Sequence, residues 1–309
     1  MMSKNQSILF AVTFLVASAA VAARADTITH GSTTINMDFV NVGNAGNPAD
    51  TTMMDDGTTG YGAVGYAYRI GTYDVTAAQW AAVYAADPNV GTAPYWSGSQ
   101  PAAGMTWNQA AEFCNWLTTG NALSGYYSIS GGSATPNALS HDAYAALHGT
   151  TYFLPTENEW YKAAFYSGRR STYYTYATGS NSVPTAVYSG TAAGTAVFYG
   201  NGVSPTAPAA VDEAGGLSPY GTMGQDGNVW QWNETAIGSY RGLRGGGWDI
   251  NSYSLASSGR GNGDYYFPSL EDNNVGFRVA SSEAVPEPGS IILLIAGALA
   301  VLIGWGRWR

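Results

Sequence analysis

The sequence predicts an α+β domain with few helices, short strands and long ordered loops. Three helix starts carry capping signals, and the segments Ile35–Val42 and Ala67–Ile70 have the side-chain alternation of strands. Residues 168–219 are rich in Gly, Ser, Thr and Ala, and tyrosines punctuate them, which favours ordered loops with short strands over a linker. This mixture of elements is typical of the α+β class.

Each predicted helix begins at a threonine that Gln or Glu follows three residues later. The pairs are Thr76 with Gln79, Thr106 with Gln109, and Thr156 with Glu159. In such a capping box, each of the two side chains accepts a hydrogen bond from the backbone N–H of the other residue. The pattern therefore predicts where three helices start.

The only cysteine, Cys114, lies on the apolar face of the second predicted helix. Trp107, Ala110, Ala111 and Leu117 share that face at helical spacing. We therefore interpret Cys114 as a buried structural thiol. A single cysteine also excludes an internal disulfide and a redox pair of thiols.

The N-terminus, residues 1–25, has the pattern of a signal peptide. Lys4 precedes an apolar run over residues 8–23, which ends in the small-x-small sequence Ala23-Arg24-Ala25. Signal peptidase would cleave after Ala25 and leave Asp26 as the new N-terminus. An N-terminal membrane helix is the alternative, but polar residues interrupt the run and no charged stop follows. We therefore expect an exported protein.

The C-terminus, residues 284–309, has the pattern of a sorting tail. Pro286-Glu287-Pro288 precedes an apolar run over residues 291–304, and Trp and Arg end the chain. The run is shorter than the roughly 20 residues of a comfortable membrane span, so a thinned bilayer, a transient signal and a buried helix are the alternatives. The segment resembles a PEP-CTERM tail. This resemblance implies membrane attachment, at least transiently, and an exosortase-type sorting enzyme as partner.

Residues 26–283 remain as one domain, long enough to form its own core. The whole chain has a net charge of −9, and charged residues make up 11% of it. Because an acidic protein repels phosphate backbones, nucleic acid is excluded as a partner. A surface of Ser, Thr, Asn, Gly and Tyr suits a carbohydrate-rich extracellular setting.

Six segments of this domain form an ordered series of motifs. They are residues 73–80, 105–117, 153–164, Gly227–Trp232, Leu243–Trp248 and Asn274–Arg278. In this order they resemble the formylglycine-generating enzyme family, also called sulfatase-modifying factor domains, from about residue 36 to 281. The resemblance implies a compact formylglycine-generating-enzyme-like fold, related to the C-type lectin fold.

Most motif residues are expected to hold the fold. Glycines 245–247 allow close approach or positive φ, and three tryptophans offer large areas for burial. These tryptophans are Trp230, Trp232 and Trp248. Arg244, Arg260 and Arg278 are expected to bind loop carbonyls or carboxylates such as Asp249 and Asp264.

The chemistry of the family is not expected here. The resemblance implies a copper-binding cysteine pair shortly after the Arg-Gly-Gly segment, but residues 245–260 contain only serines at such positions. The serines are Ser252, Ser254, Ser257 and Ser258. Because a hydroxyl is a poor ligand for soft copper, we exclude formylglycine generation.

Other metals have weak candidates. His141 and His148 lack a third ligand nearby, so we interpret them as solvated loop histidines. The resemblance implies a calcium site at the Gly-Asn-Val-Trp turn, where the candidates are Asp226, Gly227, Val229 and Gln231. Because Gln231 replaces a glutamate, the site is weakened, and calcium remains an open alternative. No other cofactor is predicted.

We therefore expect a non-catalytic binding or structural module of the cell envelope or extracellular matrix. Its ligand would be a polysaccharide or a surface protein, and aromatic, amide and carboxylate side chains suit both. The candidate binding residues, which also suit a merely solvated loop, are Asp249, Asn251, Tyr253, Asp264, Tyr265 and Tyr266. Two alternatives are an exported metal-dependent oxidoreductase that uses His141 or His148, and a maturation factor for another exported protein.

Overall fold

The computed structural model describes residues 24–260 and 267–282. The expected signal sequence up to residue 23 and the expected sorting tail lie outside the described residues. Within the described ranges, no helix is both long enough and apolar enough to cross a membrane.

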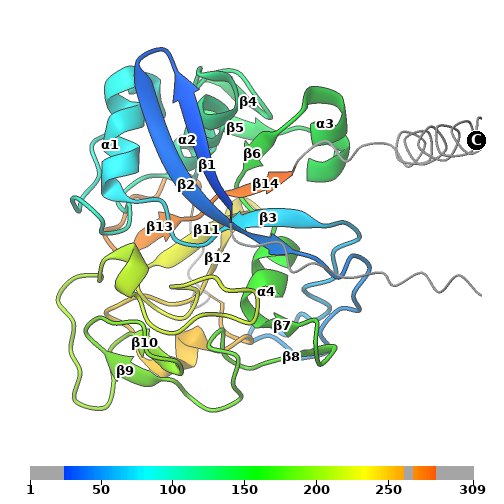
Figure 1. Cartoon of the computed structure of the whole chain (residues 1–309), viewed down its shortest axis with the longest axis vertical. Helices are drawn as coiled ribbons and strands as arrows, with labels where there is room; N and C mark the ends of the chain where they lie inside the picture. Colours follow the sequence, from blue (N-terminus) through cyan, green and yellow to red (C-terminus); the bar gives the residue numbers. More distant parts are fainter. Residues whose placement is uncertain (1–23, 261–266, 283–309) are drawn as a thin grey trace, which may run out of the picture.

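An antiparallel sheet of five strands forms one side of the domain. Its order is β1-β2-β3-β14-β6, so that the first and last described strands belong to one sheet. The strands are β1 (Arg24–His30), β2 (Thr33–Val42), β3 (Tyr68–Gly71), β6 (Thr151–Phe153) and β14 (Ala280–Ser282). Both predicted strands are confirmed, as β2 and β3. In Figure 1 the β1–β2 hairpin crosses the front of the molecule.

Three of the four α-helices in the described ranges begin directly after the predicted threonines. Helices α1 (Ala77–Ala86), α2 (Trp107–Thr119) and α4 (Glu157–Phe165) each have a complete capping box. Helix α3 (His141–His148) was not expected, and the interpretation of His141 and His148 as loop residues is wrong. Short 3-10 turns cover Pro88–Val90, Val211–Glu213 and Ser252–Leu255.

A second sheet and several two-stranded ribbons complete the α+β fold. The second sheet has the order β12-β11-β13, and β11 runs parallel to β13. Its strands are β11 (Trp230–Ile237), β12 (Tyr240–Arg244) and β13 (Val275–Phe277). The ribbons pair β4 (Tyr127–Ser130) with β5 (Ser133–Pro136), β7 (Tyr166–Ser167) with β8 (Thr172–Tyr173), and β9 (Thr185–Val187) with β10 (Thr195–Val197). Residues 168–219 are thus loops with short strands, as expected.

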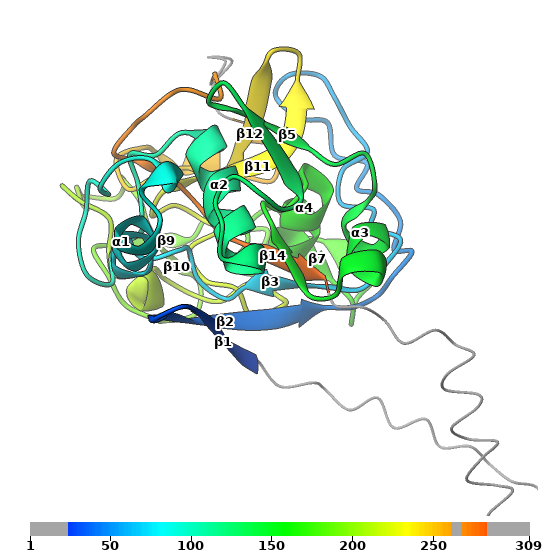
Figure 2. The same ribbon diagram turned by 90° about the horizontal axis from the view of Figure 1, so that it is seen from above.

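Aromatic side chains dominate the core between the two sheets. Figure 2 shows α2 and α4 between the β1–β2–β3 side and strands β11 and β12. Trp80 stacks on Phe113 at a centroid distance of 5.4 Å, and both contact Phe277 edge-on. Cys114 is wholly buried in this core, which confirms it as a packed thiol.

Strand β1 is fixed to its sheet by a partly buried ion pair. The Asp26 carboxylate lies 2.8 Å from Arg69 Nη1 and accepts a hydrogen bond from the Tyr152 hydroxyl at 2.9 Å. The pairing joins β1, β3 and β6. Asp26, the expected first residue after cleavage, therefore belongs to the folded domain.

Candidate functional site

The Arg-Gly-Gly segment at the end of β12 is buried. Arg244 is 1% exposed, and its Nε donates to Glu157 Oε1 at 2.8 Å. Its Nη1 donates to the carbonyls of Ser257 and Gly259 at 2.8 and 2.9 Å. The expectation that arginines bind loop carbonyls is confirmed for Arg244, but its carboxylate partner is Glu157 and not Asp249.

A second arginine reaches the same carboxylate. Arg260 donates through Nη2 to Glu157 Oε1 at 2.6 Å and forms an ion pair with Asp56. Its guanidinium also lies 4.6 Å from the centroid of the Tyr61 ring. Glu157 thus joins Arg244, at the end of β12, to Arg260 in the segment that follows. Asp264, another expected partner, lies outside the described residues.

The serines after β12 are packed against this cluster. Gly245 and Gly246 adopt φ of 102° and 75°, as expected, and a Cβ at Gly245 would come within 3.0 Å of the Gln225 carbonyl. Ser254 and Ser257 are buried. The segment that would carry a cysteine pair in the family therefore has hydroxyls inside a packed turn.

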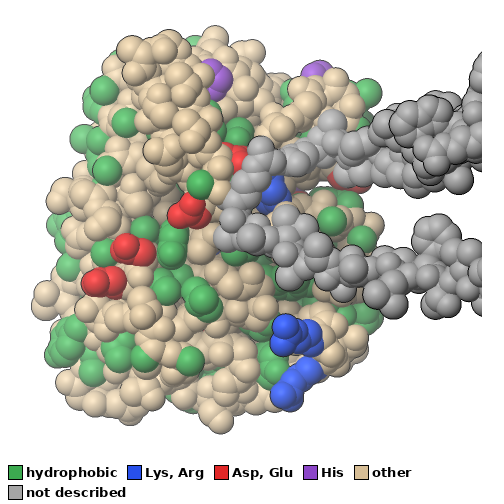
Figure 3. Space-filling model, viewed as in Figure 1, with side chains coloured by type: hydrophobic (Ala, Val, Ile, Leu, Met, Phe, Trp, Pro, Cys, Tyr) green, Lys and Arg blue, Asp and Glu red, His purple; other side chains and the backbone are tan. Residues whose placement is uncertain are grey.

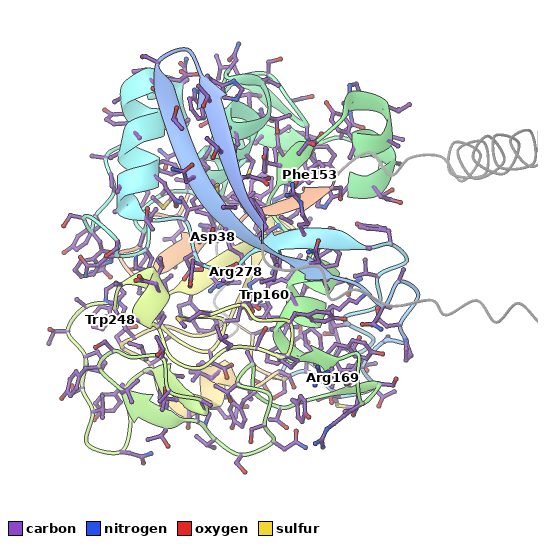
Figure 4. The ribbon with its side chains drawn as sticks, viewed as in Figure 1. Asp38, Phe153, Trp160, Arg169, Trp248 and Arg278 are labelled. Carbon is purple, nitrogen blue, oxygen red and sulfur yellow. The ribbon has the colours of Figure 1, made fainter. Side chains whose placement is uncertain are left out.

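Arg278 is the third arginine that was expected to bind carbonyls or carboxylates. It is also buried and lies at the centre of the molecule in Figure 4. Its Nη2 donates to Asp74 Oδ1 at 3.1 Å and to the Met223 carbonyl at 2.8 Å. Its Nε donates to Gln231 Oε1 at 2.6 Å. Arg278 therefore contacts one of the candidate calcium ligands directly.

Gln231, one of the candidate calcium ligands, already binds other groups through both ends of its amide. Gln231 Oε1 also accepts from Trp160 Nε1 at 2.6 Å, and Gln231 Nε2 donates to the Gly224 carbonyl at 2.6 Å. Gly227 and Val229 are buried beside it in the chain. The side chain that replaces the family's glutamate therefore serves Arg278 and Trp160 as an acceptor.

Asp226, the remaining calcium candidate, is buried with one oxygen unused. Its Oδ2 accepts from the Thr178 backbone N–H at 3.1 Å, whereas Oδ1 has no hydrogen-bond partner among the described residues. Burial raises the pKa of Asp226 to about 7, although two backbone N–H groups oppose this shift. Across the described ranges, no three His, Cys, Asp or Glu side chains are grouped to hold a metal.

His141 lies in a buried polar cluster instead of a solvated loop. The residue is 1% exposed, and its ring stacks on Phe153 at a centroid distance of 3.9 Å. Nδ1 lies 3.0 Å from Glu159 Oε1, and Nε2 lies 3.3 Å from Glu234 Oε2. Burial alone would lower the pKa of His141, but the two carboxylates outweigh it and raise the pKa to about 10.

Tyrosine hydroxyls complete the cluster around His141. Tyr66 donates to Glu159 Oε1 at 3.0 Å, and Tyr127 donates to Glu234 Oε2 at 2.7 Å. Burial would raise the pKa of Glu159, but the imidazolium of His141 holds it below its usual value. The polar groups of these residues pair with one another. We therefore interpret the cluster as a structural connection between α3, α4 and β11.

An open hollow lies on another part of the surface. Its volume is about 580 Å³, and Tyr95, which is 63% exposed, forms an aromatic wall. Among the described residues, the lining is Thr92, Ala93, Tyr95, Gly104, Glu271, Asp272 and Asn273. No Lys, Arg or His occurs in this lining. The hollow therefore combines an aromatic ring with carboxylate and amide groups.

Two tryptophans support the hollow. Trp96 Nε1 donates to the Asn273 carbonyl at 2.7 Å, and its ring contacts Tyr95 edge-on at a centroid distance of 4.8 Å. Trp248 contacts Trp96 edge-on at 6.3 Å. Trp248 is only partly buried and lies at one edge of the molecule in Figure 4, whereas Trp230 and Trp232 are buried as expected.

The three expected binding residues that the structure describes have different surroundings. The Asp249 carboxylate accepts from Asn274 Nδ2 at 3.1 Å. Asn274 directly follows Asn273, which lines the hollow. Asn251 caps the turn at Ser252–Leu255 by accepting from the Tyr253 N–H. Tyr253 is exposed, and the carboxylate of Asp55 raises the pKa of its hydroxyl. The other candidates, at positions 264–266, lie outside the described residues.

The hollow was missed because it joins distant segments. Residues 92–95, Gly104 and residues 271–273 meet only in the folded chain. The one available signal was the adjacent aromatic pair at positions 95 and 96. On the face shown in Figure 3, charged side chains occur only in small groups, as the composition predicted.

Comparisons with known proteins agree with the motif series. The chaperone protein LppX of Paenibacillus barcinonensis is 28% identical over 266 residues, which cover 78% of this chain and 90% of that protein. Two solved structures share the fold. Treponema denticola variable protein 1 has a TM-score of 0.55 at 22% identity, over 83% of this chain and 98% of its own. CarF has a TM-score of 0.56 at 20% identity, over 81% and 99%.

The family described as the sulfatase-modifying factor enzyme 1-like domain matches residues 62–283. With the α+β architecture and the two similar structures, this match confirms the expected formylglycine-generating-enzyme-like fold. The chain belongs to the sulfatase-modifying factor enzyme 1-like domain family.

Proposed function

We propose that this protein is a non-catalytic binding module of the cell envelope, with the hollow beside Tyr95 as its binding surface. The contrast between two regions carries the proposal. The segment after β12 has buried serines around Arg244. In the hollow, by contrast, the Tyr95 side chain is exposed, and the same lining contains carboxylate and amide residues. A fixed aromatic ring beside such groups suits a sugar or a protein surface.

The thiol of this chain supports a non-catalytic role. Cys114 is wholly buried, and burial raises its pKa well above the usual value. Because the thiolate is the form that reacts and binds soft metals, this environment suppresses both activities. Cysteine-based oxidation of another protein thus has no suitable group in this chain.

Affinity electrophoresis combined with an oxygen electrode tests this proposal. The purified full chain would migrate through gels that contain polysaccharide from the producing organism, and the same preparation would be mixed with a cysteine-containing peptide and a copper salt. We expect retardation in the gel and no oxygen uptake above the copper blank. Chain-dependent oxygen uptake with loss of the peptide thiol would establish an oxidase and refute the proposal.

Export is part of the same proposal. The signal-like N-terminus and the PEP-CTERM-like tail support it, and so does Asp26, whose contacts with Arg69 and Tyr152 survive a cut after Ala25. Intact-mass measurement of the protein from the envelope fraction is the test. We expect a chain that begins at Asp26, and a cytosolic chain that still begins at Met1 would contradict export.

A maturation factor is the second candidate, because the relative LppX is named as a chaperone. A chaperone also binds without catalysis, so the two candidates differ only in the ligand. Crosslinking in intact cells followed by affinity purification separates them. One exported protein enriched in stoichiometric amounts, together with unretarded migration in polysaccharide gels, would favour the maturation factor.

A further inference from the structure

We propose that the ligand of the hollow is an amino-sugar oligomer whose hexosamine units carry free ammonium groups. This inference rests on the proposed binding function and names the class of ligand. It follows from a fixed aromatic platform, an acidic wall that lacks cations, and the size of the hollow.

Tyr95 is exposed but held in place. Its backbone N–H donates to the Ala103 carbonyl at 2.9 Å, and its ring contacts Trp96. Gly104 packs closely, because a Cβ there would lie 3.3 Å from the Cβ of Tyr95. A ring that is both exposed and restrained binds the apolar face of a pyranose with little loss of conformational entropy.

Part of the lining is acidic. Glu271 is exposed. The Asp272 carboxylate accepts from the Asn274 backbone N–H, and the backbone carbonyl of Asp272 accepts from the Val275 N–H. Within the described part of the chain, no cationic side chain lines the hollow. Sulfated, phosphorylated or uronic sugars would meet like charge, whereas an ammonium group would be attracted to both carboxylates.

The size of the hollow favours an oligosaccharide over a folded protein. Its volume of about 580 Å³ lies within the usual range for small-molecule sites, roughly 300–1,000 Å³. A specific protein interface commonly requires about 800 Å² from each partner. Thr92 and Asn273 add polar groups for the ring hydroxyls.

Isothermal titration of the full chain with three tetrasaccharides tests the inference. They are a glucosamine tetramer, its N-acetylated counterpart and a β-glucose tetramer. We expect the glucosamine tetramer to bind at least tenfold more tightly than the other two, and its affinity to fall as salt rises, because salt screens exposed charges. Equal affinity for the three sugars would overturn the inference but leave the binding function intact.

Variants locate the contact. Glu271→Gln should weaken glucosamine binding about threefold, as for an exposed ion pair, and leave the glucose tetramer unchanged. Tyr95→Ala should weaken all three at least tenfold, whereas Tyr188→Ala, at another exposed tyrosine, should change none. Binding that survives Tyr95→Ala, or tighter binding of a Lys-rich peptide than of any sugar, would overturn the assignment. To refute the proposed binding function as well, the wild type would have to bind neither envelope polysaccharide nor envelope protein.

Discussion

His141 Nδ1 and Glu159 Oε1 lie 3.0 Å apart, and both side chains are almost wholly buried. The pair joins the first residue of α3 to the third residue of α4. Glu159 also accepts the capping bond from the Thr156 N–H at 2.7 Å, so one carboxylate fixes two helix starts. This arrangement makes His141 a structural residue whose charged form is favoured by the carboxylates of Glu159 and Glu234.

Replacing His141 should destabilise the protein. In His141→Gln the carboxylates of Glu159 and Glu234 stay buried without a cation between them, and breaking such a pair costs about 3–5 kcal/mol. Urea unfolding followed by tryptophan fluorescence gives the free energy of unfolding. The matched variant His148→Gln changes an exposed histidine of the same helix and should cost about 0.5 kcal/mol or less. Equal effects of the two variants would refute the role of His141.

The same pair predicts a dependence of stability on pH. The pKa of His141 is raised from 6.5 to about 10, so its stabilising effect is complete below pH 6.5 and is lost as pH rises through 10. The advantage of the wild type over His141→Gln should therefore shrink between these values, by up to about 1.4 kcal/mol per pH unit. Unfolding free energies of both proteins across this range provide the test, and a constant difference would contradict it.

Glu157 should matter as much as His141. In Glu157→Gln, Arg244 and Arg260 lose the carboxylate that they share, and Arg244 is wholly buried. We expect a loss of about 3 kcal/mol in the free energy of unfolding. Glu213→Gln removes an exposed glutamate and is the control, expected within about 0.5 kcal/mol of the wild type. A neutral Glu157→Gln would mean that the loop carbonyls suffice to hold Arg244 and that Asp56 suffices to hold Arg260.

Calcium should have little effect on this protein. Gln231 Oε1 already accepts from Arg278 and Trp160, so a cation near it would meet a guanidinium. A site filled at a hundred times its Kd would stabilise the fold by about 2.7 kcal/mol. We expect no change in Tm on adding excess calcium chloride. A rise that a chelator reverses, and that Asp226→Asn abolishes, would instead establish a calcium site.

Local patterns in the sequence predicted the elements that local bonds define. The starts of α1, α2 and α4 were predictable because a capping box needs only four consecutive residues. Helix α3 was missed because Ser140, its N-cap, makes no side-chain capping bond. Strand β2 was predictable because apolar and polar side chains alternate along one continuous segment.

The sites depend on contacts that no local pattern encodes. Arg244 meets Glu157 across 87 positions, and His141 meets Glu234 across 93. The sequence indicated that Arg244 would bind a carboxylate, but several acidic residues could satisfy it equally. The hollow likewise arises where segments around Tyr95 and Asp272 are brought together by the fold.

The most direct test of the central claim is the affinity of the wild type, Tyr95→Ala and Tyr188→Ala for isolated envelope polysaccharide. Both tyrosines are exposed, so neither change should disturb the core. We predict saturable binding by the wild type and Tyr188→Ala, and at least tenfold weaker binding by Tyr95→Ala. Saturable binding that is equal in all three proteins would contradict the hollow as the site, and no binding by the wild type would contradict the polysaccharide-binding role.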